Sequence, residues 1–164
     1  MRFTLIYQGR LLAKSVGDNS RVMHEHEIRK QIHKQLAVLW RVQYPLPGIA
    51  AGLASHIAGP QRSARPMIEA LCCEKGAFCF VPLVSTHMGL VSRLDIQFLR
   101  RENPGEIVRH GGDLDNRLKT LFDALRIPDV VGDNQKPEQC ETPFFFCLLE
   151  DDALITGLVW EICG

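Results

Sequence analysis

The side chains best suited to chemistry in this chain of 164 residues are carboxylates that gather in two short stretches. Residues 111–125 read Gly-Gly-Asp-Leu-Asp-Asn-Arg-Leu-Lys-Thr-Leu-Phe-Asp-Ala-Leu, and residues 150–155 read Glu-Asp-Asp-Ala-Leu-Ile. Carboxylates that a fold brings together repel one another. A hard divalent cation such as Mg²⁺ relieves that repulsion because it prefers oxygen ligands. If the fold joins these two stretches, we expect a metal site between them.

Such a site suits the hydrolysis of a phosphodiester, whose negative charge repels an attacking hydroxide. A bound divalent cation lowers the pKa of its water, orients the scissile phosphate and neutralises the charge that develops on it. A nearby ammonium can bind a nonbridging or leaving oxygen, which gives Lys119 a role.

A helix is predicted to present the first acidic stretch. Its apolar residues recur at steps of three and four, the pattern of one buried face: Leu114, Leu118, Leu121, Phe122 and Leu125. Asp113 is a good N-cap, and Asp115 and Lys119 are neighbours on the opposite face because they are four residues apart. The spacing leaves an ordinary alternative open, in which Asp113 caps the helix and Asp115–Lys119 is a surface ion pair.

The first stretch resembles the central signature of the RusA family of Holliday-junction resolvases. The likeness lies in Asp-Leu-Asp-Asn at 113–116, in Lys119 and in Phe-Asp-Ala-Leu at 122–125, while residues 151–155 resemble the second acidic element of that family. It implies a mixed α/β homodimer that uses Mg²⁺, with Mn²⁺ as a substitute, to nick paired strands of branched DNA. Two symmetric sites would then address two symmetric strands.

By position, the resemblance makes Asp113, Asp115 and Asp152 the metal-binding catalytic acids and Lys119 the catalytic lysine. Asp151 is the adjacent acid, and whether Asp151 or Asp152 points inward stays open. Asn116 matches the motif without a defined role, and Glu150 is a weaker candidate ligand. The chain departs from the family in a longer insert before Glu150, in fewer arginines before the first aspartate and in its N-terminal region.

The distribution of charge favours a nucleic-acid partner, although equal numbers of basic and acidic residues argue weakly against one. Residues 1–126 carry a net charge of +7 and residues 127–164 a net charge of −7. A basic body could attract phosphates while the carboxylates stay on a separate patch; the alternative is an internal charge match within one domain. The predicted DNA contacts are Arg100, Arg101, Arg109 and Arg117.

Composition predicts one cytoplasmic domain. The length suits a single core, no apolar run is long enough to span a bilayer, and the first residues lack the cleavage pattern of a signal peptide. The six cysteines include no Cys-x-x-Cys pair, so a structural zinc site is not expected. We predict that they are reduced thiols, mostly buried.

The pattern of elements predicts an α+β fold over residues 1–164, with a mixed sheet of about four to five strands packed against two main helices, as in the RusA family. Irregular segments are expected at about 44–66 and about 127–143. The predicted helices are 20–42 and 113–125. The predicted strands are 2–8, 77–84, 90–99 and 158–162, with 144–149 as a buried strand or helix segment.

Two local features of these elements carry expectations of their own. Pro82 should lie at a sheet edge or a bulge, because proline cannot donate to the ladder. The first helix should bury an apolar stripe and leave its polar residues in solvent. These are the histidines His24, His26 and His33 and the basic residues Arg29, Lys30 and Lys34.

The sequence leaves two other function classes open beside a nuclease. One is a non-catalytic module that binds nucleic acid or a protein partner, in which the carboxylates only cap and solubilise. The other is a structural oligomeric subunit.

Overall fold

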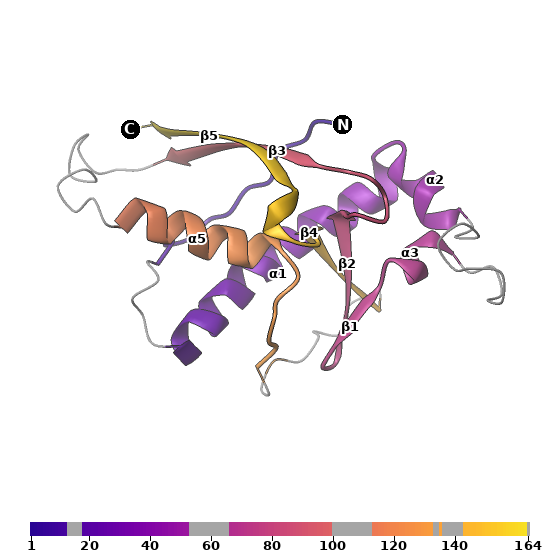
Figure 1. The fold of residues 1–164 in the computed structure, drawn as a ribbon, viewed down its shortest axis with the longest axis horizontal. Helices are drawn as coiled ribbons and strands as arrows, with labels where there is room; N and C mark the ends of the chain where they lie inside the picture. The colour runs from indigo at the N-terminus through magenta and orange to yellow at the C-terminus, as the bar shows by residue number, and fades with distance from the viewer. Residues whose placement is uncertain (13–17, 53–65, 100–112, 133–134, 136–142, 164) are drawn as a thin grey trace.

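The computed structural model describes residues 1–12, 18–52, 66–99, 113–132, 135 and 143–163 (Figure 1). Within these ranges it is an α+β fold with five strands, and the predicted fold class is confirmed. The helices are α1 (Asp18–Val42), α2 (Leu46–Ala51), α3 (Met67–Ala70), α5 (Asp113–Leu125) and the 3₁₀ helix η1 (Asp152–Leu154). The strands are β1 (Cys73–Lys75), β2 (Phe78–Val84), β3 (Ser92–Leu99), β4 (Phe144–Leu149) and β5 (Ile155–Cys163).

The strands divide between two sheets. The first has the order β1-β2-β4, with β1 antiparallel and β4 parallel to β2, so it is mixed as predicted. The second pairs β3 with β5 in parallel. The run of phenylalanines and leucines at 144–149 is a strand rather than a helix, and almost all of it is buried because α1 covers it.

The main core forms where α1 packs on β4. The spacing predicts a buried stripe of Ile28, Ile32, Leu36, Leu39 and Trp40. All of them except the partly buried Leu39 are at most 3% exposed. The ring of Trp40 stacks on Phe146, with the ring centroids 5.8 Å apart. With 25 residues, α1 is the longest helix in the described ranges (Figure 1).

The prediction that the polar residues of this helix are solvated is wrong for three of them. His26, Arg29 and His33 are only 3–5% exposed, because β4 and α5 both pack against α1 and cover more than its apolar stripe. Two of them form hydrogen bonds across those contacts. His33 Nδ1 accepts a hydrogen bond from the backbone N–H of Phe146 at 2.9 Å, and Arg29 donates to the backbone oxygen of Asp123 at 2.7 Å.

Residues 2–8 form no strand, contrary to the prediction, because two glutamine side chains of α1 take the place of a neighbouring strand. Gln35 accepts from the N–H of Ile6 at 2.8 Å and donates to its carbonyl at 2.7 Å, and Gln31 makes the same pair of bonds to Gln8. Side chains four residues apart on a helix are about 5–6 Å apart, and residues i and i+2 of an extended chain are separated by a similar distance. The two glutamines can therefore bond to two residues of the extended segment. The predicted alternation holds, with Phe3, Leu5 and Tyr7 partly buried.

Pro82 lies in the middle strand of the first sheet, where its local surroundings resemble an edge. β1 pairs with β2 only as far as Phe80, so among the described residues β4 is the one strand that pairs with β2 at Pro82. A residue without an N–H is tolerated there because no ladder continues on the other side.

The prediction of reduced thiols fails for one pair of cysteines. Cys72 and Cys79 form a disulfide, with their Cα atoms 5.4 Å apart across the β1–β2 hairpin. Cys73, Cys147 and Cys163 are free thiols, and Cys140 lies outside the described residues. Burial raises the pKa of the Cys147 thiol to about 12, so this thiol stays protonated at neutral pH.

Replacing both Gln31 and Gln35 with alanine is expected to lower the free energy of unfolding by about 1–3 kcal/mol, because four hydrogen bonds to the N-terminal segment are lost. Urea denaturation measures this change. Gln43→Ala is the matched control, since its side chain makes only a 3.5 Å contact to Tyr44. A double variant as stable as the parent would mean that apolar contacts alone hold residues 1–12.

Candidate functional site

The first acidic stretch lies on α5, which ends where the apolar spacing predicts but begins at Asp113, so Asp113 is the first residue of the helix and not the predicted N-cap. Lys119 Nζ lies 2.7 Å from Asp115 Oδ2, and the two side chains are 51% and 73% exposed. An ion pair this exposed contributes at most about 1 kcal/mol to stability. Both groups therefore remain accessible to a ligand, although the same geometry also describes an ordinary surface pair. The side chain of Asp113 lies outside the described part of the chain.

The second acidic stretch forms a turn between β4 and β5. Glu150 is engaged, since its Oε2 accepts from the backbone N–H and the hydroxyl of Thr86 at 2.7 and 2.8 Å. Asp151 caps η1 by accepting from the N–H of Ala153 at 2.8 Å. Asp152 is exposed in the first turn of η1. Asp151 and Asp152 thus offer carboxylates at the surface, whereas Glu150 serves the fold.

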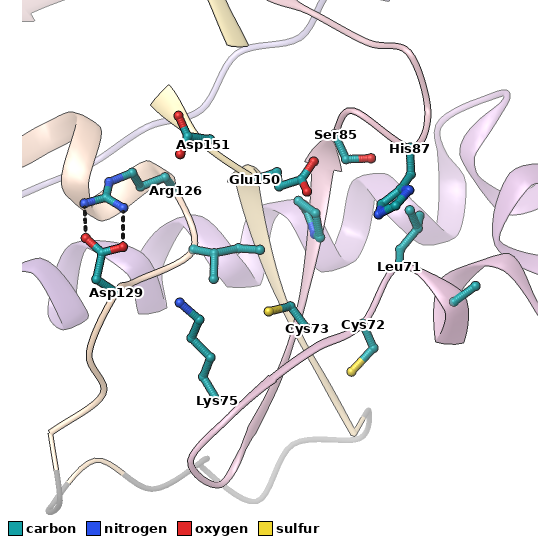
Figure 2. Close-up of a pocket in the computed structure, with 13 residues that line it drawn as sticks. Leu71, Cys72, Cys73, Lys75, Ser85, His87, Arg126, Asp129, Glu150 and Asp151 are labelled. Atoms are coloured by element: carbon teal, nitrogen blue, oxygen red, sulfur yellow. Dashed lines mark hydrogen bonds and ion pairs between the residues drawn. The ribbon is translucent and has the colours of Figure 1, made fainter. Parts of the chain in front are cut away.

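A pocket of about 400 Å³ lies beside this turn (Figure 2). It opens at the carboxyl ends of the parallel strands β2 and β4, an edge where ligands commonly bind in α/β sheets. Glu150 and Ser85 follow these two strands and lie close together in Figure 2. The charged and polar residues that line it are Cys73, Lys75, Ser85, His87, Arg126, Asp129, Glu150 and Asp151. Of the predicted metal ligands, Asp151 and the weaker candidate Glu150 are among them.

Most charges of this pocket are already paired. Arg126 donates to both carboxylate oxygens of Asp129, at 3.0 and 2.6 Å, and also to Asp123. The hydrogen bond to Asp129 raises the pKa of Arg126 above its usual range, and the same bond lowers the pKa of Asp129. Lys75 donates to the backbone oxygen of Pro128 at 2.8 Å. Arg126, Asp129 and Lys75 are therefore held by interactions within the protein, whereas His87 and Asp151 line the same pocket and are exposed.

The two acidic stretches lie at different ends of α5. Arg126, just after the helix, is bridged to Leu149, so the acidic turn lies near the C-terminal end of α5 (Figure 1). Asp115 lies in the first turn, and the ten residues from it to Leu125 span about 15 Å at 1.5 Å per residue. No contact between Asp115 and Asp151 or Asp152 is described.

The metal site stays a prediction. Among the side chains that the structure describes, no group of three or more His, Cys, Asp or Glu is placed to hold a metal ion, but Asp113 is outside that set. Of the predicted DNA contacts, Arg117 is half-buried on α5, and Arg100, Arg101 and Arg109 lie outside the described residues.

Asp123 is a residue whose role the sequence did not reveal. Its carboxylate accepts from Arg21 of α1 at 3.3 Å and from Arg126 at 3.1 Å, while its backbone oxygen accepts from the buried Arg29 at 2.7 Å. It therefore fixes α5 against α1. In the resolvase-like signature this aspartate is one of the Phe-Asp-Ala-Leu residues, and the structure gives it a structural function. Arg21 and Arg29 lie too far away in the sequence to signal this, whereas Arg126 is only three residues from Asp123.

Comparison with family models, curated proteins and solved structures finds no match to this chain. The likeness to the RusA family therefore rests on the residues of the two acidic stretches. None of the helices in the described ranges combines the length and apolar character that a membrane crossing requires.

Asp123→Asn is expected to lower the free energy of unfolding by about 2 kcal/mol, because two charge-assisted hydrogen bonds are weakened where the carboxylate is only 19% exposed. Asp129→Asn is the matched control. Its side chain is 73% exposed and pairs with the same Arg126, so it should cost less than about 1 kcal/mol. Chemical denaturation compares the two, and equal losses would contradict the assignment of Asp123 as the central acceptor.

Proposed function

We propose that this protein is a Mg²⁺-dependent, structure-selective endonuclease that hydrolyses phosphodiester bonds in branched DNA. The observation that carries the proposal is the surface of α5, where a resolvase-like signature exposes Asp115 and Lys119 side by side in the first two turns. A helix N-terminus is also a favourable place for a phosphate, because its free N–H groups and dipole attract anions.

The donor chemistry at this end of α5 fits Mg²⁺. This ion keeps several waters and takes one or two carboxylates together with phosphate oxygens, and Asp115 offers an exposed carboxylate beside Asp113 in sequence. When bound, the ion would supply a water of lowered pKa and neutralise charge on the phosphate. Asp151 or Asp152 would complete the set if the acidic turn approaches the first turn of α5.

Lys119 has a defined task in this proposal. Its ammonium lies 2.7 Å from Asp115 Oδ2. If Asp115 turns its carboxylate to a cation, the ammonium is released and can bind a nonbridging or leaving oxygen of the scissile phosphate. One exposed ion pair would thus serve as both metal ligand and phosphate contact.

The partner proposed for this site is DNA, bound by a homodimer. The excess of basic residues in 1–126 would draw the phosphate backbone to the protein. A two-fold dimer carries two equal sites, which suits paired cuts in a junction with similar symmetry.

The second candidate is a non-catalytic module that binds nucleic acid or protein. The separation of the two acidic stretches along α5 favours it, since a surface pair and a capped turn need no metal. This candidate predicts salt-sensitive DNA binding without a cleaved product. Incubating the protein with four-way, flap and linear DNA in Mg²⁺ or EDTA separates the two.

Asp115→Asn is expected to fold like the parent and to lose cleavage of four-way DNA in Mg²⁺ by at least about 100-fold, because a neutral amide is a poor ligand for this ion. Gel analysis of labelled junctions measures the product. Asp95→Asn, an exposed carboxylate on β3, is the control and should cleave normally. Undiminished cleavage by the Asp115 variant would defeat the site.

Asp151→Asn and Asp152→Asn, made separately, should identify which acid of the turn joins the metal. Asparagine caps a helix about as well as aspartate, so the Asp151 variant keeps the fold of η1 and a loss of cleavage would report the missing charge. We expect one variant to lose cleavage and the other to keep most of it. If both cleave like the parent, the acidic turn has no part in the site.

A further inference from the structure

The pocket beside the acidic turn is separate from the exposed pair on α5. It lies near the C-terminal end of that helix, whereas Asp115 and Lys119 lie in the first two turns. Its volume of about 400 Å³ is near the lower end of the range for small-molecule sites, about 300–1,000 Å³. The buried side chains of Leu71, Pro82 and Ile127 give it an apolar wall. A pocket of this kind suits one small ligand that a few polar groups hold in place.

Two carboxylates that line the pocket each have one oxygen open to a ligand. Glu150 accepts hydrogen bonds from Thr86 through Oε2, and Asp151 accepts one from Ala153 through Oδ1. None of the described residues donates to the other oxygen of either carboxylate. The lining therefore offers two acceptors to a ligand, Glu150 Oε1 and Asp151 Oδ2.

A lysine and a histidine complete the polar lining. In Figure 2 the side chain of Lys75 lies across the pocket from Glu150 and Asp151. Its ammonium has three N–H donors, and it uses one of them to bind the backbone oxygen of Pro128 at 2.8 Å. His87 also lines the pocket, is exposed, and forms no hydrogen bond with the described residues. Donors of the lysine and the imidazole ring are thus available to a ligand.

These open groups match guanine better than any other base of DNA. Guanine has two adjacent donors on its pairing edge, N1–H and the 2-amino group, and two acceptors beside them, O6 and N7. Adenine, cytosine and thymine each have a single donor group on that edge. The two open carboxylate oxygens can therefore accept from both donors of guanine, while Lys75 donates to O6 or N7. The imidazole of His87 can stack on the ring, as aromatic side chains do on unpaired bases.

We infer that this pocket binds an unpaired guanine of the DNA, turned out of the base stack. Proteins that read such a base form hydrogen bonds to its pairing edge and pack apolar or aromatic side chains on its ring. The inference rests on the proposed function, since branched DNA supplies the base, but these contacts need no metal and no cleavage. A strand bound along α5 would present a base to the pocket and a phosphate to Asp115. The pocket would then select which branched sequences are cut.

Single nucleotides test the recognition of the base without cleavage. In EDTA, dGMP should bind the parent protein with a dissociation constant in roughly the millimolar range, measured by NMR titration. Deoxyinosine monophosphate lacks the 2-amino group and should bind at least about fivefold more weakly, and dAMP should bind more weakly than dGMP by at least the same factor. Equal binding of the three nucleotides, or no binding of dGMP, would overturn the inference.

Glu150→Gln keeps an oxygen that can accept from Thr86 and replaces the open oxygen with an amide N–H₂, which repels the donors of guanine. It should weaken binding of dGMP at least about tenfold. Glu74→Gln is the control, because Glu74 is exposed on β1 and does not line the pocket. Circular dichroism of both variants checks the fold. A folded Glu150 variant that binds dGMP like the parent would exclude this pocket as the guanine site.

Duplexes with one unpaired nucleotide test whether the base comes from DNA. Fluorescence anisotropy in EDTA should show that a duplex with an unpaired guanine binds at least about fivefold more tightly than one with an unpaired thymine. Glu150→Gln should abolish this preference. Binding of dGMP without a preference between the duplexes would overturn DNA as the source and indicate a free nucleotide. Cleavage of junctions without any guanine preference would contradict this inference alone, whereas guanine binding without cleavage would contradict only the proposed nuclease.

Discussion

The structure depends on the burial of α1 between β4 and α5. Burying a polar group is costly unless it is hydrogen-bonded, and this helix buries two histidines and an arginine. His33 is matched by a backbone N–H of β4, and Arg29 by a backbone oxygen of α5. These bonds fix the position of both neighbours relative to α1. The exposed face of α5, with Asp115 and Lys119, is therefore set by contacts made on its other side.

The same constraint decides which charges are available for chemistry. Asp123 and Arg126 are partly buried and satisfied by ion pairs that join α1, α5 and the chain after α5. In contrast, Asp115, Lys119 and Asp152 are exposed, and little stability depends on them. A metal or a phosphate can bind to charged side chains that are exposed to water and that contribute little to stability. The candidate site differs from the pocket near the acidic turn because its charged side chains are exposed, whereas the pocket contains the partly buried Arg126 in ion pairs.

Sequence periodicity predicted the elements that have one buried face. The bounds of α5 and the alternation of β3 follow from spacing that is local to each element. It could not predict that α1 is covered on two sides, because that depends on which elements pack against it. For the same reason residues 2–8 were predicted as a strand, although their partners are glutamines of a helix. The Asp115–Lys119 pair was predictable from its four-residue spacing, whereas the pocket arises from the pairing of β2 with β4 and leaves no local signal.

The separation of the acids along α5 limits how one ion could be held. Two residues apart within a regular helix, Asp113 and Asp115 would point to nearly opposite sides, since successive residues turn by about 100°. In the structure α5 begins at Asp113 itself, so this residue is the first of the helix and not its cap. Mg²⁺ needs only one or two carboxylates when water and phosphate complete its shell. A metal at the first turn of α5 therefore does not require the acidic turn, and the orientation of Asp113 is the feature on which the nuclease proposal depends most.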